Sequence, residues 1–431
     1  MGAHSVTPPT VTVAARDPIV GTVNARVSTG WSLPVADPDG PDLRGGARPA
    51  VWIGAPAPGG LTLPAATPTA AYLYGPRGVW LDDRHLIVAD SGNHRVLIWN
   101  DPAALADHAE ADVVLGQPDV TSEGPQAAGR GPERGMHLVT GLLVTPDGRL
   151  VVADAWNHRL LIWSSVPTVS DTAPDVVIGQ PDASSVEPNR GGGAGPDTFY
   201  WPFGVALIDG DLWVADTGNR RVLRFAGMPE PGDRPELILG QPDAYSRDEN
   251  GGGIGAGTFR WPHAIAALTD GVLVADAGNH RLLGFDPPRV FGQPDFETAQ
   301  ELPYAPQSAS TLRFPYSVVT TQVVEPVEPT GRHATDVAGD VDQLHHRSSP
   351  AMAVADTANN RVLWWATLPA GSNTPADGVL GQFDFAAVGE NRWDLVGRDT
   401  LCWPYGLALH GNRLAVADSG NNRVMIWEWA T

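Results

Sequence analysis

The chain has a single cysteine, Cys402, among its 431 residues, so it can form no intrachain disulfide. No segment approaches the ~20 consecutive apolar residues of a membrane-spanning helix. Residues 1–16 lack both a basic start and a long apolar run, so they do not resemble a standard signal peptide. These absences predict a soluble, cytoplasmic protein that does not insert into a membrane.

Basic residues are also scarce. The chain has 28 Lys and Arg against 49 Asp and Glu, which gives a formal net charge of −21. Such a surface repels phosphate groups, so nucleic acids and anionic membranes are poor candidate partners. Glycine and proline, by contrast, are abundant, at 49 and 40 residues. Among many short apolar runs, they are typical of the turns of an all-β fold.

A short pattern, Ala-Asp-x-x-Asn-x-Arg, occurs six times, with its aspartates 60 to 80 residues apart. A period of this length indicates a repeat architecture. Because the copies are alike and evenly spread, we assign their aspartates a structural role rather than a catalytic one. We expect each carboxylate to accept backbone N–H groups of the turn that follows it, and each Asn to take a left-handed backbone. The six aspartates are Asp90, Asp154, Asp216, Asp276, Asp356 and Asp418.

Each repeat contains four short strand signals. In the first repeat, the runs 78–81, 86–89, 96–99 and 113–115 are rich in β-branched and aromatic residues and end at turn residues. The runs are continuous rather than alternating, so both faces of each sheet should be covered. Four antiparallel strands, repeated radially, describe the blade of a β-propeller.

A second pattern, Gly-Gln-Pro-Asp, follows the outermost strand of five repeats. The sixth repeat ends with the chain and has no such strand. The run Val51–Ile53, near the N-terminus, has the character of the missing strand. We therefore expect it to complete the sixth blade, which removes the two free sheet edges and closes the ring. The five copies begin at Gly116, Gly179, Gly240, Gly292 and, as Gly-Gln-Phe-Asp, at Gly381.

The turns at 91–96, 155–160 and 277–282 resemble the signature of NHL repeats. This resemblance implies a six-bladed NHL propeller over residues 46–431, of the bacterial type with Gly-Gln-Pro-Asp repeats. Residues 1–45 are expected to form an irregular N-terminal extension. The longer spacing in the fifth blade implies an insertion at about 325–349. Its His333, His345 and His346 are assigned to a surface loop rather than to a metal site.

The links between blades are long, about 20 residues each. Several of them reach the next blade through an aromatic residue followed by proline, as in Trp201-Pro202 and Trp261-Pro262. We expect this aromatic to anchor the link by packing over the blade below. The same face should carry the links, the repeated turns and one mouth of the central channel.

The residue that begins each innermost strand differs from one repeat to the next. Structural positions should repeat, so variable positions in a regular ring are the candidates for binding. A set of two Tyr, one Phe, one His and one Arg suits a small polar-aromatic ligand or a peptide side chain. A plug of ordinary side chains with water is the alternative. These channel-mouth residues are Arg77, Thr140, Phe203, His263, Tyr316 and Tyr405.

Two functions stay open. The first is a non-catalytic binding or scaffold module that holds a protein partner with the channel-mouth face and the links. Family association suggests a multi-subunit redox enzyme, such as a hydrogenase, as that partner. The second is a lyase or hydrolase with its site around His263, Tyr316 and Tyr405. The peptide-amidating lyases that this fold resembles hold zinc with three histidines, whereas these positions offer one. We therefore expect a protein-binding module without metal or cofactor.

Overall fold

The computed structural model describes residues 42–54, 67–301, 306–321 and 350–430. They belong to the second of two compact units, Pro38–Thr431. The N-terminal extension up to residue 41 and the insertion expected at 325–349 lie outside the described residues. Among the described residues, no helix is long and apolar enough to cross a membrane.

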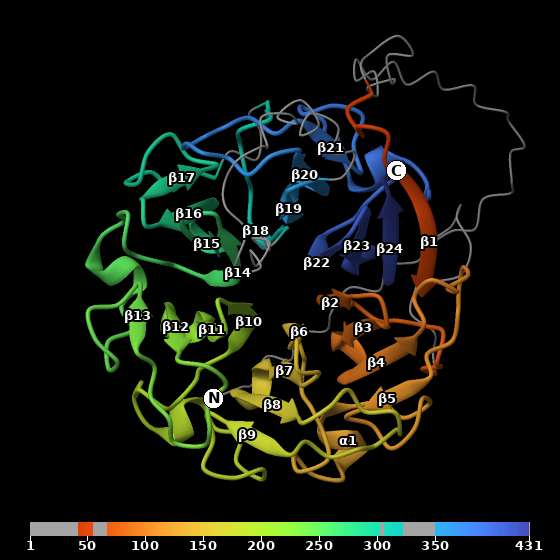
Figure 1. Cartoon of the computed structure of the whole chain (residues 1–431), viewed down its shortest axis with the longest axis vertical. Helices are drawn as coiled ribbons and strands as arrows, with labels where there is room; N and C mark the ends of the chain where they lie inside the picture. The colour runs from red at the N-terminus through yellow and green to blue at the C-terminus, as the bar shows by residue number, and fades with distance from the viewer. Residues whose placement is uncertain (1–41, 55–66, 302–305, 322–349, 431) are drawn as a thin grey trace, which may run out of the picture. The chain divides into compact units, whose positions relative to one another are not determined.

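Six sheets of four antiparallel strands build this unit (Figure 1). The strands of the first three blades are β2 (Gly78–Leu81), β3 (His85–Asp90), β4 (Arg95–Asn100), β5 (Val113–Leu115), β6 (Leu142–Val144), β7 (Leu150–Asp154), β8 (Arg159–Trp163), β9 (Val176–Ile178), β10 (Pro202–Ile208), β11 (Asp211–Asp216), β12 (Arg221–Phe225) and β13 (Leu237–Leu239). Those of the last three are β14 (Pro262–Leu268), β15 (Gly271–Asp276), β16 (Arg281–Phe285), β17 (Arg289–Phe291), β18 (Pro315–Thr320), β19 (Met352–Asp356), β20 (Arg361–Trp365), β21 (Gly378–Leu380), β22 (Pro404–His410), β23 (Arg413–Asp418), β24 (Arg423–Glu428) and β1 (Arg48–Gly54). The segment α1 (Pro125–Gly129) is a single turn in the first link, and its three central residues have a left-handed backbone, so it is not a regular α-helix.

The N-terminal strand closes the ring, as the sequence predicts. β1 pairs with β24 in antiparallel register, from Arg48 opposite Glu428 to Gly54 opposite Arg423. Figure 1 shows the red strand β1 beside the blue strand β24. Around the ring, the innermost strand of each blade contacts that of the next: β2, β6, β10, β14, β18, β22 and again β2.

The apolar strands are buried on both faces because each blade is packed between two others. Successive residues of a strand point to opposite faces of the sheet. Val88 of β3 therefore packs with Val424 of the sixth blade, while its neighbour Ile87 packs with Val152 of the second. This arrangement explains why the runs are continuous rather than alternating.

Each Ala-Asp-x-x-Asn-x-Arg turn is held by a buried network around its aspartate. In the third blade, Oδ2 of Asp216 accepts Nδ2 of Asn219 and Nε of Arg221, both at 2.8 Å. Oδ1 accepts the backbone N–H of Tyr200, also at 2.8 Å. Both the aspartate and the arginine are fully buried. Equivalent bonds form at Asp90, Asp154, Asp276, Asp356 and Asp418.

Two details of the turn differ from the expectation. The N–H bound by Asp216 belongs to the link that precedes the inner strand, because the aspartate pairs with Pro202 at the start of that strand. The left-handed residue is not the Asn but the residue after it, which is Arg220 in this blade, with φ of 57°. The Asn itself lies in a short 3₁₀ turn, Thr217–Asn219, and its side-chain amide donates a hydrogen bond to the aspartate. The other 3₁₀ turns of this kind are η1 (Ser91–Asn93), η2 (Ala155–Asn157), η6 (Ala277–Asn279), η8 (Thr357–Asn359) and η10 (Ser419–Asn421).

The Gly-Gln-Pro-Asp segments fasten the links to these turns. Nε2 of Gln180 donates to the carbonyls of Asn157 and Glu187, at 3.0 and 2.9 Å. Oδ1 of Asp182 accepts the N–H of Ser184 at 2.9 Å, which forms a tight local turn. Gly179 has φ of 96°, and a Cβ there would lie 2.2 Å from the ring of Phe199. Each of these three residues therefore has a structural role.

At five of the six joints, the left-handed residue of the turn also binds the next blade. Nδ1 of His158 accepts the N–H of Trp201 at 3.0 Å, and this Trp has φ of 58°. The pairs His94–Leu138, His280–Phe314, Asn360–Trp403 and Asn422–Gly75 repeat the bond, and each of these second residues also has a positive φ. At the remaining joint, Arg220 offers no acceptor, and the N–H of Trp261 binds Oδ1 of Asp276 at 3.2 Å.

Candidate functional site

Bulges at the start of four inner strands aim the variable residues into the channel. The pairing register shifts just after the first proline in β10, β14, β18 and β22. A bulge releases a side chain from the regular alternation and gives it a new direction. Phe203, His263, Tyr316 and Tyr405 occupy these bulges, and all four line the channel.

Close backbone approach keeps this end of the channel narrow. A Cβ at Gly204 would lie 2.2 Å from the carbonyl oxygen of His263 in the next blade. At Gly78, Gly141 and Gly406, a Cβ would lie 1.8 to 2.6 Å from the corresponding carbonyl oxygens. Glycine is needed where two inner strands touch at this distance. The residues just before these glycines, Arg77, Thr140, Phe203 and Tyr405, therefore lie close to one another in the channel.

All six residues predicted at the channel mouth meet there. The ring centres of Phe203 and His263 are 4.2 Å apart, and those of His263 and Tyr316 are 4.5 Å apart. Tyr316 stacks on Tyr405 at 4.6 Å with an angle of 15° between the rings. Arg77 places Cζ 5.2 Å from the ring centre of Tyr405. Oγ1 of Thr140 completes the circle by donating to the carbonyl of Phe203 at 2.8 Å.

His263 is neutral at physiological pH. Burial lowers the pKa of its ring to about 4; the hydrogen bond to the carbonyl of Trp261 opposes this shift, and the charge of Arg77 adds to it. Because a carbonyl can only accept, the 2.9 Å contact between Nδ1 and this oxygen places the proton on Nδ1. General acid–base catalysis works best when the pKa lies near the working pH. A pKa of about 4 is poorly matched to such a role at neutral pH.

Tyr316 and Arg77 give this end of the channel its polarity. Burial raises the pKa of the Tyr316 phenol, as do the neighbouring Tyr405 and a hydrogen bond between the two side chains. The phenol therefore stays protonated. The guanidinium of Arg77 is half-buried and, among the residues that the structure describes, forms no ion pair or hydrogen bond. It leaves a positive charge at the inner end of the channel.

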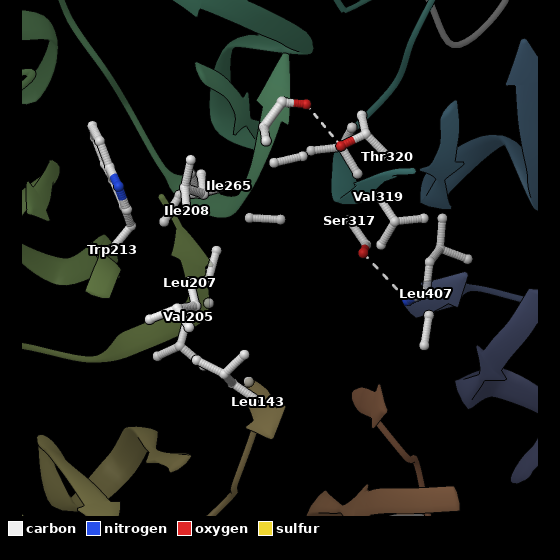
Figure 2. Close-up of a pocket in the computed structure, with 18 of the residues that line it drawn as sticks. Leu143, Val205, Leu207, Ile208, Trp213, Ile265, Ser317, Val319, Thr320 and Leu407 are labelled. Atoms are coloured by element: carbon white, nitrogen blue, oxygen red, sulfur yellow. Dashed lines mark hydrogen bonds between the residues drawn. The ribbon is translucent and has the colours of Figure 1, made fainter. Parts of the chain in front are cut away.

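Beyond these six residues the channel widens into a cavity of about 1440 Å³. Figure 2 shows apolar side chains on its walls, such as Leu143, Val205, Leu207, Ile265 and Val319 of the inner strands, and polar groups make up nearly half of the exposed lining. The lining runs from the channel-mouth residues to the loops that join the first and second strands of the blades; from the described links it includes only Arg77, Thr140 and Gly141, which directly precede β2 and β6. The cavity therefore opens on the face opposite the repeated turns. We call the two faces the hairpin face and the turn face.

Exposed apolar side chains gather on the turn face. Seven large ones are exposed among the described residues, and six of them belong to links or repeated turns: Tyr74, Trp156, Tyr245, Trp393, Leu395 and Trp403. Val169, between β8 and β9, is the one on the hairpin face. Trp156 also packs edge-on against the half-buried Trp201, with ring centres 5.8 Å apart.

The aromatic before each proline is not the anchor that we expected. Trp403 is 38% exposed, and Trp201 and Trp261 are half-buried. The link is anchored instead by the residue two positions earlier, because Phe199 and Phe259 are almost fully buried. The left-handed or bulged backbone at the strand start turns the later aromatic outward.

The sequence matches a known repeat in two of the blades. A model of the NHL repeat matches residues 73–99 and 259–285, which cover β2 to β4 and β14 to β16. With six blades built on the same turn, this match decides the family. The chain is an NHL-repeat propeller. No curated protein sequence matches it.

Solved structures similar to this NHL propeller include a streptogramin B lyase, with 10% identity and a TM-score of 0.41 over 85% of this chain and 96% of that one. A virginiamycin B lyase from Staphylococcus aureus has 11% identity and a TM-score of 0.38, over 82% and 94%. An auxiliary nutrient binding protein from Bacteroides thetaiotaomicron has 12% identity and a TM-score of 0.44, over 83% and 70%. Similarity at this level says nothing about the activity of the chain.

Metal ligands do not cluster in the described part of the NHL propeller, where no three His, Cys, Asp or Glu side chains are grouped to hold an ion. The insertion histidines considered in the sequence lie outside the described residues. Sequence reasoning missed two features of the site. One is the apolar cavity, whose walls are strand residues such as Val205 and Leu207 that read as ordinary core. The other is the exposed Trp156, which occupies a variable position of a repeated turn.

Proposed function

We propose that this NHL propeller is a non-catalytic binding module that docks a protein partner on its turn face. The observation that carries the proposal is the uneven distribution of exposed apolar side chains, six of seven on one face. Aromatic side chains, Trp and Tyr above all, are enriched among the residues that dominate protein interfaces. Five of the six exposed side chains on the turn face are Trp or Tyr.

The turn face is also held rigid, which favours tight association. Trp201 has a left-handed backbone that bulky residues rarely adopt, and the acceptor on His158 fixes it there. The same bond holds Trp403 through Asn360 at 2.9 Å. Side chains that are ordered before binding lose less conformational entropy when a partner arrives. These residues therefore present preformed contacts.

The geometry favours binding over the alternative of a lyase or hydrolase centred on His263, Tyr316 and Tyr405. The His263 ring lies between Phe203 and Tyr316 and is 7% exposed. Its pKa of about 4 and the raised pKa of Tyr316 suit a stacked plug better than a proton-transfer pair. A multi-subunit redox enzyme such as a hydrogenase stays a prediction for the partner, which copurification from the source cell tests.

The test compares the two faces with matched truncations. The tagged chain captures its partner from source cells, the partner is identified and purified, and its Kd is measured for each variant. We expect Trp156→Ala and Trp403→Ala each to weaken binding about tenfold, typical of an interface aromatic. Val169→Ala, an exposed apolar residue on the hairpin face, should leave the Kd unchanged.

Each variant is first checked by thermal unfolding, because all three side chains are at least 38% exposed and their loss should not affect folding. A Kd that is unaffected by both tryptophan variants but raised by Val169→Ala would contradict docking on the turn face.

A further inference from the structure

The cavity on the hairpin face is a second candidate site, apart from the turn face. Its walls expose apolar side chains that the propeller itself leaves partly uncovered, among them Val205, Leu207, Val319 and Leu409. Its volume of about 1440 Å³ exceeds the ~300–1000 Å³ of most small-molecule sites. The cavity can therefore hold an elongated occupant that carries both apolar and polar groups.

At the inner end of the cavity, Arg77 favours a negatively charged group of a ligand. Arg77 is half-buried there without a carboxylate partner among the described residues, although the chain carries a net charge of −21. Half-buried charges are costly unless a partner compensates them. Guanidinium groups pair best with planar carboxylates, which they bind with two parallel hydrogen bonds. A ligand carboxylate at Arg77 would satisfy this group.

At the outer end of the cavity, the carboxylates of the rim favour a positively charged group of a ligand. Five carboxylates, those of Asp82, Asp83, Asp209, Asp211 and Asp286, lie in its lining near the opening. They face two guanidinium groups, Arg84 and Arg224; the second of these pairs with the rim carboxylate of Asp211 at 3.7 Å and with Glu236 at 3.2 Å. His410 contacts Asp83 at 2.8 Å. The rim is therefore acidic overall, and it repels a simple anion but attracts a ligand with a distal cation.

The inner strands offer hydrogen bonds along the length of the cavity. β10, β14 and β22 are end strands of their sheets, so one backbone edge of each faces the channel rather than another strand of its sheet. On these edges, the carbonyl of Ala267 already accepts the hydroxyl of Thr320, and the N–H of Leu407 already donates to the hydroxyl of Ser317 (Figure 2). Such an edge can pair with an extended peptide. Each of these strands has seven residues, about 20 Å at ~3.4 Å per residue, so an extended peptide of six or seven residues, measured to its terminal groups, spans about the same length.

We propose that the channel of this propeller binds a short apolar peptide with free termini, which enters from the hairpin face with its carboxylate first. The carboxylate meets Arg77, the side chains contact the apolar walls, and the ammonium group stays among the rim carboxylates. The backbone edges distinguish this ligand from an apolar carboxylate without amide groups.

Calorimetric titration at neutral pH and low salt tests the proposal with a hexapeptide of alternating alanine and valine. We expect the free peptide to bind and its C-terminal amide to bind at least tenfold more weakly. The N-acetyl form should also bind more weakly, with a deficit that added salt reduces because it screens the rim. Decanoate, which has the carboxylate but neither amides nor a cation, should bind more weakly than the free peptide.

Variants of Arg77 then test whether the C-terminal carboxylate of the peptide binds at this residue. The quantity compared is the difference in affinity between the free peptide and its C-terminal amide. Arg77→Gln should abolish this difference by lowering the affinity for the free peptide, and Arg77→Lys should keep part of it. Arg84→Gln, the same change at the exposed rim, should leave the difference unchanged. Thermal unfolding confirms that each variant is folded. The proposal is overturned if no peptide binds, if acid and amide bind the wild type equally, if Arg77→Gln leaves their difference intact, or if decanoate binds more tightly than the peptide.

Discussion

Three histidines make the stability of this propeller depend on pH. Nδ1 of His94, His158 and His280 each accepts a backbone N–H from the next blade, which requires a neutral ring. Burial is the main cause that lowers the pKa of each ring to about 4. The proximity of His137 adds to the shift at His94 and His158, whereas the charge of Glu301 opposes it at His280.

The sign of the effect follows from the two states. An unfolded histidine titrates near pH 6.5, so between pH 6.5 and 4 the unfolded chain binds more protons than the folded one. The folded state therefore loses stability as the pH falls through this window. At pH 5 the full shift would cost about 2 kcal/mol per histidine. The rings keep partial contact with solvent, which screens the charge, so we expect about 1 kcal/mol each and about 3 kcal/mol in total.

The sequence supplies the matched perturbation, because Asn360 and Asn422 perform the same task at two other joints without titrating. We expect a triple variant with Asn in place of the three histidines to match the wild type at pH 8. From pH 8 to 5, its free energy of unfolding in urea should fall by about 3 kcal/mol less than that of the wild type.

The control is His158→Ala, which removes the acceptor and leaves the N–H of Trp201 unpaired. It should cost about 1–3 kcal/mol at pH 8 as well as at pH 5. If instead the triple variant and the wild type lose stability in parallel between pH 8 and 5, the three rings are not held as neutral acceptors.

The buried networks and backbone contacts give two more predictions. Asp216→Asn leaves the buried guanidinium of Arg221 without its carboxylate, so we expect the free energy of unfolding to fall by about 3–5 kcal/mol; a loss under 1 kcal/mol would contradict the role of this pair. Gly204→Ala forces a Cβ against the carbonyl oxygen of His263, and we expect a loss of at least about 1–3 kcal/mol. Gly193→Ala, where a Cβ meets nothing within 4 Å, should stay within about 0.5 kcal/mol of the wild type in the same urea titration.

Much of the fold could be predicted because the same strand signals and the same aspartate turn occur in every repeat. The aspartate turn fixed the number of blades, and the missing outer strand of the last repeat pointed to Val51–Ile53 as its replacement. The structure confirms that pairing between β1 and β24. The hydrogen bonds inside the turn were harder to predict. A sequence shows that Asp216 is followed by Asn219, but not that the link through Tyr200 passes within 2.8 Å of the carboxylate.

The candidate site was predicted in part, for a similar reason. Variation among the six inner-strand positions singled out residues that do meet, such as His263 and Tyr316. The bulges and glycine contacts that bring them together depend on neighbouring blades, which no single repeat encodes. The exposed aromatics were misjudged because a Trp before Pro looks the same in sequence whether it anchors a link or, like Trp403, points outward.

The central claim is that a protein partner docks on the turn face. The most direct measurement is side-chain footprinting by hydroxyl radicals, with and without the partner identified by capture. The account predicts that Trp156, Trp393 and Trp403 lose reactivity when the partner binds, while side chains of the hairpin face keep theirs. Unchanged reactivity at these three tryptophans, together with protection on the hairpin face, would contradict it.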